Sequence, residues 1–499
     1  MLVPSARISG ASLPRYAVVI VLDGTRPGYF NLAPMPNLRA LMARGVTYNQ
    51  AFVGQEIANT PPSHATIGTG LFPKHHGVQG FQWKDPATNA VTRPSDLAAV
   101  ESGALEQVES QHRVPSLAAS TSSSAFGGKS VSISGHKCYA ADAMGTAAAN
   151  YILCSMIYHD RWVAQAIGSH RPPPGAINNP RWDVPIPPPH SGLGPAVEQW
   201  KVGAENDWTV KYALWAFHRV HYPRLLMINL PETDVIGHYA PTSAPLRVLM
   251  KRFDRELGSI IAAYRAAGLL GRTDFVVTAD HGMSRIKNIV PYHLLEEAIA
   301  MAGTRAVYIE ADTAAAMGLR ESEMARVVSQ SLGHIGGPNV DAVYYKSVHN
   351  QIWSYHLGYA RSGLSATLLR AYHILINTAA SDTGPDVFAV YGPHTSTHDF
   401  ASNGYTWVAG HLGPQWGDQH IPLVIAGPGI RHGATSSYPA RLVDIAPTID
   451  RLLHQRSGKV DGSVLSDALV HASPTKLARQ SNRARLLVPL VRALEKRSR

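Results

Sequence analysis

Three apolar runs, each followed closely by an acidic residue, constrain the fold of this chain more than any other feature. An unbroken apolar run is typical of a strand that is buried on both faces of a parallel sheet. In open α/β sheets, ligands bind beyond the carboxyl ends of such strands, so the acidic residues are predicted to lie at one edge. The runs are YAVVIVL before Asp23, RLLMINL before Asp234 and FVVT before Asp280.

Strand and helix patterns alternate from residue 16 to about residue 453, and the alternation predicts a doubly wound, mainly parallel α/β sheet flanked by helices. Further core strands are expected at PDVFAVYG (385–392) and IPLVIAGPG (421–429). Inserted cap or lid segments are expected at about 150–203 and 345–385. The domain prediction is therefore a catalytic domain at 1–455 with these insertions, followed by a basic extension at 456–499.

The formal net charge of +10 is concentrated near the C-terminus. Residues 476–499 contain eight basic residues and one acidic residue, a charge of +7, so the rest of the chain is close to neutral. A basic face of the kind that binds a nucleic-acid polymer is therefore not expected on the body of the chain. The tail is expected to be solvated or loosely docked, with contact to a membrane surface or to a polyanion as the alternative.

The two cysteines, Cys138 and Cys154, do not belong to a CxxC pair, which excludes a cysteine-rich zinc site. They can pair in an oxidising compartment or remain two buried thiols, and both alternatives stay open. No run of 18 apolar residues is present, so no membrane-spanning helix is expected. No signal peptide is visible before Arg15.

The stretch at 58–77 (ANTPPSHATIGTGLFPKHHG) contains a candidate nucleophile. Thr60 precedes two prolines, which fit the first turn of a helix, so Thr60 is predicted at a helix N-terminus. The unpaired N–H groups there favour an anion, and a hydroxyl in such a place is a nucleophile once its proton is removed. The alternative is that Thr60 is only the N-cap of the helix.

Carboxylate and imidazole side chains at the predicted sheet edge form a candidate metal site. His238 follows Asp234 by four residues, which places both on one face of a helical turn. Such ligands fit two zinc-like ions, with manganese or iron as alternatives. One ion beside Thr60 lowers the pKa of its hydroxyl, and the other stabilises a leaving oxygen. The predicted ligands are Asp23, Thr60, Asp234, His238, Asp280, His281 and His411.

A second set of possible ligands competes with this one. His394 and His398 have HxxxH spacing and are followed by Asp399. Because HxxxH spacings often occur without a metal, this set is the less favoured of the two.

The ordered motifs resemble the alkaline phosphatase superfamily, and within it the nucleotide pyrophosphatase/phosphodiesterase branch. The resemblance rests on Asp23-Gly24, TPPSH with TGLFPKHHGV, PETDVIGH, TADHGM, the late His411 and VDIAPTIDRLL. It implies a phospho-threonine at Thr60 that water then hydrolyses, and it suggests a periplasmic or secreted protein. It also implies two zinc sites, one formed by Asp23, Thr60, Asp280 and His281 and the other by Asp234, His238 and His411.

Four further residues bear on the substrate. Diesterase relatives often have Asn where this chain has Ser63, whose hydroxyl can still donate one hydrogen bond. Lys137 matches a phosphate-binding lysine of monoester relatives, but Tyr139 and Phe81 replace their arginine and asparagine. These replacements favour a mono-anionic diester with an organic arm packed on a ring. Lys137 instead favours a monoester, or forms a salt bridge to a metal-bound carboxylate.

We therefore predict a two-metal hydrolase that acts through Thr60 on small phosphodiesters or nucleotide pyrophosphates. The alternatives on the same scaffold are a phosphomonoesterase and a phosphonate hydrolase, and a phosphomutase is the alternative from another reaction class. A sulfatase is disfavoured because TPPSH offers no arginine. A phosphate-binding module without turnover is disfavoured because all seven site positions carry competent residues.

Overall fold

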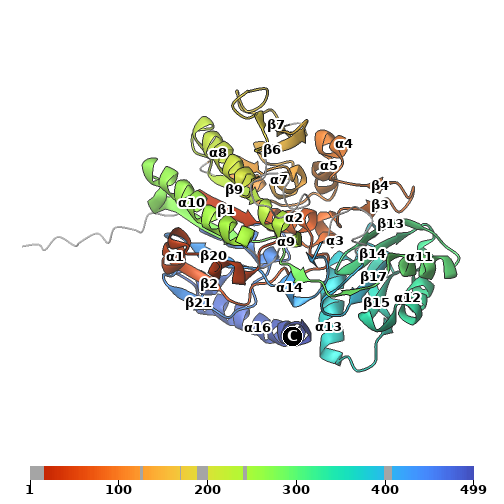
Figure 1. Ribbon diagram of the computed structural model, residues 1–499. Helices are drawn as coiled ribbons and strands as arrows, with labels where there is room; N and C mark the ends of the chain where they lie inside the picture. The colour runs from red at the N-terminus through yellow and green to blue at the C-terminus, as the bar shows by residue number, and fades with distance from the viewer. Residues whose placement is uncertain are drawn as a thin grey trace, which may run out of the picture.

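The computed structural model describes residues 16–123, 127–168, 170–187, 201–239, 244–397 and 407–498. A ten-stranded sheet with helices on both faces and a five-stranded sheet beside it organise these residues (Figure 1). Within the described ranges, no helix combines the length and the apolar character that crossing a membrane requires.

Five neighbouring parallel strands form the centre of the large sheet. The middle strands pair in register, with Tyr16 opposite Thr273 on one side and Ala17 opposite Leu225 on the other. The apolar side chains of these three middle strands, from Ala17 onward in the first, are buried on both faces, as the unbroken runs predict. In spatial order the strands are β10 (Thr273–Thr278), β1 (Tyr16–Leu22), β9 (Leu225–Leu230), β5 (Ser130–Ile133) and β6 (Tyr151–Tyr158).

Antiparallel strands extend both edges of this centre, so the predicted α/β sheet flanked by helices is confirmed as a large mixed sheet. β20 (Leu423–Ala426) lies antiparallel between β10 and β2 (Gly45–Tyr48), and β21 (Ala434–Ser436) follows β2 in parallel. At the other edge, β7 (Arg161–Ala166) and β8 (Val184–Pro185) continue from β6. The direction of β20 is not visible in its sequence, because all four of its residues are buried in either direction.

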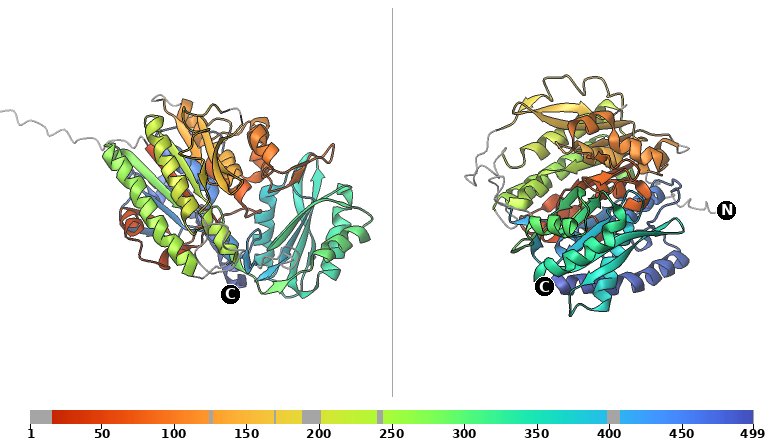
Figure 2. Two further views of the ribbon diagram at one scale, coloured as in Figure 1. Left: turned by 45° about the horizontal axis from the view of Figure 1, so that its top comes forward. Right: turned by 90° about the vertical axis from the view of Figure 1, so that its right-hand side faces the viewer.

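Alternate residues of β1 face two different cores. Val18 and Ile20 pack with the helices of one face, where α8 and α10 run side by side (Figure 2). Val19 and Val21 pack with the helices of the opposite face. The first set of helices is α1 (Pro36–Ala43), α8 (Ala204–Arg219) and α10 (Ala244–Ala266). The second set is α2 (Thr60–Thr69), α6 (Leu117–Ser123), α7 (Cys138–Gly145) and α15 (Ile445–Leu452).

The small sheet is antiparallel throughout and is covered by helices of its own. α11 (Tyr292–Met301) and α12 (Ala325–Ile335) share one of its cores, and α13 (Ala366–Ile376) lies in the other. Its strands in spatial order are β13 (Ala306–Ala311), β14 (Ala314–Leu319), β17 (Val387–Tyr391), β15 (Val340–His349) and β16 (Ile352–Ala360).

The position of β17 corrects one prediction, because residues 385–392 were expected to form a strand of the main core. β17 instead lies at the centre of the small sheet, between β14 and β15. Phe388 packs into the core beside α13, while Val387 and Ala389 pack into the core beside α11 and α12. A strand that is buried on both faces has the same apolar pattern in either sheet.

The basic C-terminal segment forms a helix whose apolar side is packed into a core, so the expectation of a solvated or loosely docked tail was wrong. α16 (Pro474–Ser498) continues through Pro489 and lies beside α13 (Figure 1). Its end is fixed by the backbone N–H of Trp416, in α14 (Trp416–Gln419), which donates to Ser498 Oγ at 2.8 Å. The apolar side chains at helical spacing that hold it are Leu487, Leu490, Val491 and Leu494.

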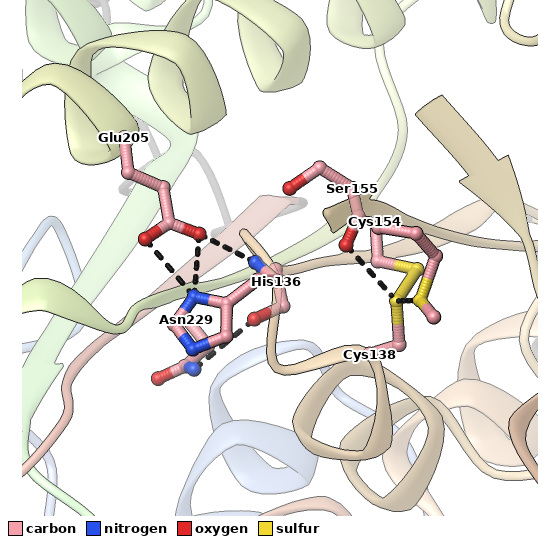
Figure 3. The surroundings of a disulfide bond; sticks show 8 residues. His136, Cys138, Cys154, Ser155, Glu205 and Asn229 are labelled. Atoms are coloured by element: carbon pink, nitrogen blue, oxygen red, sulfur yellow. Dashed lines mark hydrogen bonds and ion pairs between the residues drawn. A yellow bond between two sulfur atoms is a disulfide. The ribbon is translucent and has the colours of Figure 1, made fainter. Parts of the chain in front are cut away.

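A disulfide between Cys138 and Cys154 ties the start of α7 to β6 (Figure 3). On the other side of the same loop, the His136 backbone N–H donates to Glu205 Oε1 at 2.5 Å, and His136 Nδ1 lies 2.8 Å from that oxygen. Lys137 lies between these two attachments. The structure thus selects the disulfide from the two cysteine alternatives and shows that it helps to hold the Lys137 loop.

We expect replacement of both cysteines by alanine to lower the free energy of unfolding by about 3 kcal/mol, because a cross-link of this loop length restricts the unfolded chain. The sequence separation is 16 residues. Chemical denaturation of the wild type and of Cys138→Ala/Cys154→Ala measures the difference. Reductant should lower the stability of the wild type alone, and a wild-type curve that does not respond to reductant contradicts the prediction.

Candidate active site

The loops after the parallel strands bring the predicted acidic residues together at one edge of the large sheet. Asp23 directly follows β1, and Asp280 and His281 follow β10. α9 (Glu232–Tyr239) begins two residues after β9 and carries Asp234 and His238 one turn apart. Sequence reasoning therefore placed these side chains correctly.

Thr60 is the first residue of α2, as predicted, but it is not the N-cap. The N-cap is Asn59, whose Oδ1 accepts a hydrogen bond from the Thr60 backbone N–H at 2.8 Å. The Thr60 hydroxyl therefore takes no part in capping, and its Oγ1 lies 3.4 Å from His281 Nε2. The alternative that Thr60 serves only as the cap is wrong.

Three imidazoles share one arrangement, in which Nδ1 lies at hydrogen-bond distance from a backbone carbonyl oxygen. Because a carbonyl oxygen can only accept, Nδ1 is the donor in each contact and Nε2 is the nitrogen that remains for a metal ion, which is the usual arrangement of a metal-binding histidine. The contacts are His238 with Ala409 at 2.9 Å, His281 with Gly282 at 2.9 Å and His411 with Ala58 at 3.0 Å. Ala409 belongs to β19 (Ala409–Gly410), directly before His411.

The three Nε2 atoms face the carboxylates. His238 Nε2 and His411 Nε2 lie 3.3 and 3.4 Å from Asp234 Oδ1. His281 Nε2 lies 3.3 Å from Asp280 Oδ2 and 3.6 Å from Asp23 Oδ1. The structure thus brings all six predicted Asp and His ligands into one buried cluster with Thr60.

The chemistry of this cluster fits divalent cations. Asp234 Oδ1 and Asp280 Oδ2 are buried, yet neither accepts a well-aligned hydrogen bond from a described residue. Buried carboxylate oxygens without a hydrogen bond are costly unless a cation compensates their charge. Two groups have ligand atoms within 4.8 Å of one another, namely Asp234, His281 and His411, and Asp23, His64 and Asp280.

His64 is a neighbour of the site that sequence reasoning did not select. Its Nδ1 lies 2.9 Å from the Thr60 carbonyl oxygen and 3.5 Å from Asp280 Oδ2. The signal was present in the sequence, because His64 follows Thr60 by four residues and therefore lies one helical turn further on the same face. Its contact with the Thr60 carbonyl makes it a support for the first turn of α2.

Lys137 neutralises part of the negative charge. Its Nζ lies 2.9 Å from Asp23 Oδ1 and 2.7 Å from Asp234 Oδ2. Burial and the nearby Asp280 raise the pKa of Asp23, against the opposing effect of Lys137. Burial also acts to raise the pKa of Asp234, but Lys137 and His238 outweigh it and hold that pKa well below its ordinary value. Lys137 therefore joins the carboxylates of two different loops.

A pocket of about 410 Å³ opens over the cluster. Phe81 and Tyr139 line it as an edge-to-face pair with ring centroids 5.1 Å apart. Trp407 also lines it and stacks on His238, with 3.9 Å between the two ring centroids. The polar lining residues include Thr60, Lys137, Asp234, His238 and His411. The buried residues Asp23, Ser63, Asp280 and His281 do not contribute to the lining.

Not every residue or segment that was predicted to belong to the site lies at the pocket. The Ser63 hydroxyl is buried and has no hydrogen-bond partner among the described residues, so its role toward substrate stays a prediction. His394 Nδ1 lies 3.0 Å from the Arg285 carbonyl oxygen and belongs to neither ligand group. His398 and Asp399 lie outside the described residues. No described residue of 150–203 or 345–385 lines the pocket.

Two acidic residues at the end of β13 support the site from the small sheet. Glu310 Oε1 accepts from Asn59 Nδ2 at 2.6 Å, and Glu310 Oε2 accepts from the backbone N–H of Phe81 at 2.9 Å. Burial raises the pKa of Glu310 to about 7, although its N–H donors act to lower it. Asp312 Oδ2 accepts from the His411 backbone N–H at 3.0 Å. Neither residue follows a strand of the large sheet, so the strand-end pattern did not reveal them.

Most of the sequence matches one family model. The family is described as type I phosphodiesterase / nucleotide pyrophosphatase, and the match covers residues 17–374. Human ectonucleotide pyrophosphatase/phosphodiesterase family member 5 is 23% identical over 394 residues, or 75% of this chain and 69% of that protein. Bis(5'-adenosyl)-triphosphatase enpp4 of Xenopus laevis is 31% identical over 88 residues, and this matched stretch covers only 18% of this chain and 19% of that curated relative.

The fold is similar to solved structures of the alkaline-phosphatase-like class. Wild-type alkaline phosphatase PafA superposes with a TM-score of 0.68 at 16% identity, covering 94% of this chain and 100% of that chain. Murine ectonucleotide pyrophosphatase/phosphodiesterase 5, an inactive form in complex with AMP, gives a TM-score of 0.57 at 18% identity, with 90% and 97% covered. These similarities show the fold.

We expect Glu310→Gln to lower kcat/KM by about tenfold, the effect of losing one buried hydrogen bond to a charged acceptor. The new amide N–H₂ faces an N–H donor, either that of Asn59 or those of Phe81 and Gln82. Steady-state kinetics on a chromogenic phosphate ester measure the change. The control is Glu323→Gln, an exposed carboxylate near the same sheet, and equal rates for the two variants contradict the supporting role.

Proposed function

Because the chain belongs to the type I phosphodiesterase / nucleotide pyrophosphatase family, and is therefore a hydrolase, we propose that it hydrolyses small phosphate esters through Thr60, with diesters and nucleotide pyrophosphates preferred. The observation that carries this proposal is the position of the Thr60 hydroxyl. It lies at the pocket, is not used for capping, and is 3.4 Å from His281 Nε2 within the Asp/His cluster.

The family and the Asp/His clusters imply dependence on a divalent metal. We propose two zinc ions, with manganese or iron as alternatives, since carboxylate and imidazole ligands accept several of these ions. When bound, such ions withdraw electron density from the Thr60 hydroxyl and from phosphoryl oxygens. The proposed ligands are Asp23, Thr60, Asp280 and His281 for one ion and Asp234, His238 and His411 for the other.

The proposed reaction has two displacements at phosphorus. In the first, Thr60 Oγ1 gives its proton to solvent and forms a bond to phosphorus, while the leaving oxygen departs with the electron pair of the broken P–O bond and takes up a proton from solvent. In the second, a water oxygen bonds to phosphorus and releases a proton, and the bond to Oγ1 breaks so that Oγ1 takes up a proton and Thr60 is restored. Thr60 lies at the N-terminal end of α2, and the positive end of the helix dipole there favours negative charge on the phosphoryl group.

Two observations support a preference for diesters. The ammonium of Lys137 is already shared by Asp23 at 2.9 Å and Asp234 at 2.7 Å, so its charge is largely compensated before a dianionic monoester arrives. Phe81 and Tyr139 offer a ring surface for an organic arm, together with Trp407. The murine relative was solved with AMP, which makes nucleotides the first organic arm to test.

Lys137 also carries the second candidate function, because a lysine that lines the pocket can bind a monoester phosphate. The phosphonate hydrolase alternative differs only in the bond that is broken. A phosphomutase would transfer the phosphoryl group to another hydroxyl instead of releasing it to water. The disulfide supports a periplasmic or secreted location for the protein, because such bonds persist in oxidising compartments.

We expect zinc-loaded protein to hydrolyse bis-p-nitrophenyl phosphate faster than p-nitrophenyl phosphate. Thr60→Ala should lower the diester rate by roughly 10³-fold or more, because the nucleophile is removed. Chelation should abolish the rate, and added zinc should restore it in the wild type alone. Thr60→Ser is the matched control, since it keeps a hydroxyl at the same position.

The outcome separates the candidates. A monoester rate above the diester rate assigns the pocket to phosphomonoesters and gives Lys137 a direct contact with phosphate. Turnover of either ester that persists in Thr60→Ala contradicts the covalent threonine. No turnover of either ester directs the test to phosphonates and to phosphoryl transfer between alcohols.

A further inference from the structure

A second groove, of about 800 Å³, lies between the start of α13 and the C-terminal half of α16. It shares no lining residue with the catalytic pocket. Its walls combine basic side chains with small polar and apolar ones. The residues that carry the argument are Arg361, Ser365, Leu368, Arg492, Lys496 and Arg497.

The groove has an excess of positive charge. Arg361 and Arg497 both contact Asp341 Oδ1, at 2.9 and 2.7 Å, so one carboxylate serves two guanidinium groups. Arg492 and Lys496 are exposed and form no ion pair with any residue of the described ranges. The local charge of these five side chains is therefore +3, and guanidinium groups in such a place bind phosphate oxygens well.

The outward side of α16 extends the basic surface beyond the groove. Arg485, Arg492 and Lys496 are spaced by seven and four residues, which places them on one side of the helix, and all three are exposed. Leu486 lies beside them with 69% of its surface exposed. The opposite side of α16 is buried in the core beside α13, so the basic side remains directed outward.

We propose that this surface, the groove together with the outward side of α16, docks on membranes rich in anionic phospholipid, with a headgroup phosphate in the groove. Charge complementarity favours this occupant, because clustered basic residues are attracted to anionic headgroups. The exposed Leu486 favours a lipid surface over a nucleic acid, since an apolar side chain beside a basic stripe can enter the acyl boundary. The association is peripheral and independent of the proposed catalysis.

Co-sedimentation of the full chain with lipid vesicles tests the proposal. We expect binding to phosphatidylcholine vesicles that contain about 30% phosphatidylglycerol, and no binding to pure phosphatidylcholine. Binding should weaken strongly between about 0.05 M and about 0.5 M salt, because screening shortens the range of the attraction. Arg492→Gln/Lys496→Gln should reduce the vesicle partition coefficient by about tenfold or more.

The matched control is Arg247→Gln/Lys251→Gln, which removes two exposed charges from α10 on another part of the molecule. It should bind vesicles like the wild type. Equal losses of vesicle binding in the two double variants overturn the assignment, because binding would then depend on the net charge of the protein and not on this surface. Binding to duplex DNA or to tripolyphosphate without binding to anionic vesicles also overturns it and reassigns the groove to a different anion. Thermal unfolding verifies that each variant is folded.

Discussion

The structure depends on the burial of three carboxylates and three imidazoles at one edge of the parallel centre of the large sheet. Buried negative charges repel one another and are stable only when cations share the space. Lys137 supplies one such cation, and Asp234 Oδ1 and Asp280 Oδ2, which accept no well-aligned hydrogen bond from a described residue, leave a need for more. The features around the cluster keep these charges in place. The disulfide and Glu205 hold the loop that carries Lys137, and backbone carbonyl oxygens fix the orientation of the imidazole rings.

The two sheets contribute differently to the site. The large sheet supplies the cluster, because the carboxyl ends of its parallel strands meet at one edge. The small sheet supplies support, through Glu310 to Asn59 and Phe81 and through Asp312 to His411. The pocket is thus built where the sheets meet, and its ring-bearing walls come from neither of the segments that were expected to cap it.

Much of this was predictable because the informative residues lie next to features that sequence shows directly. Asp23 and Asp280 follow apolar runs, and the spacing of Asp234 and His238 is helical. The assignment of β17 to the large sheet was wrong, because the sequence of a strand buried on both faces does not show which strands it pairs with. Glu310 escaped prediction because its role depends on contacts with residues more than 200 positions away.

The docking of α16 has a consequence for the order in which the molecule is assembled. The core beside α13 contains Leu375 and Ile376, but it is completed by side chains from residue 487 to residue 494. Until those residues have left the ribosome, the nascent chain exposes an apolar surface along α13 that has no covering. The large sheet and its candidate ligands can form earlier in synthesis. The site is then assembled before the core beside α13 is complete, and that core stays accessible to chaperones in the interval.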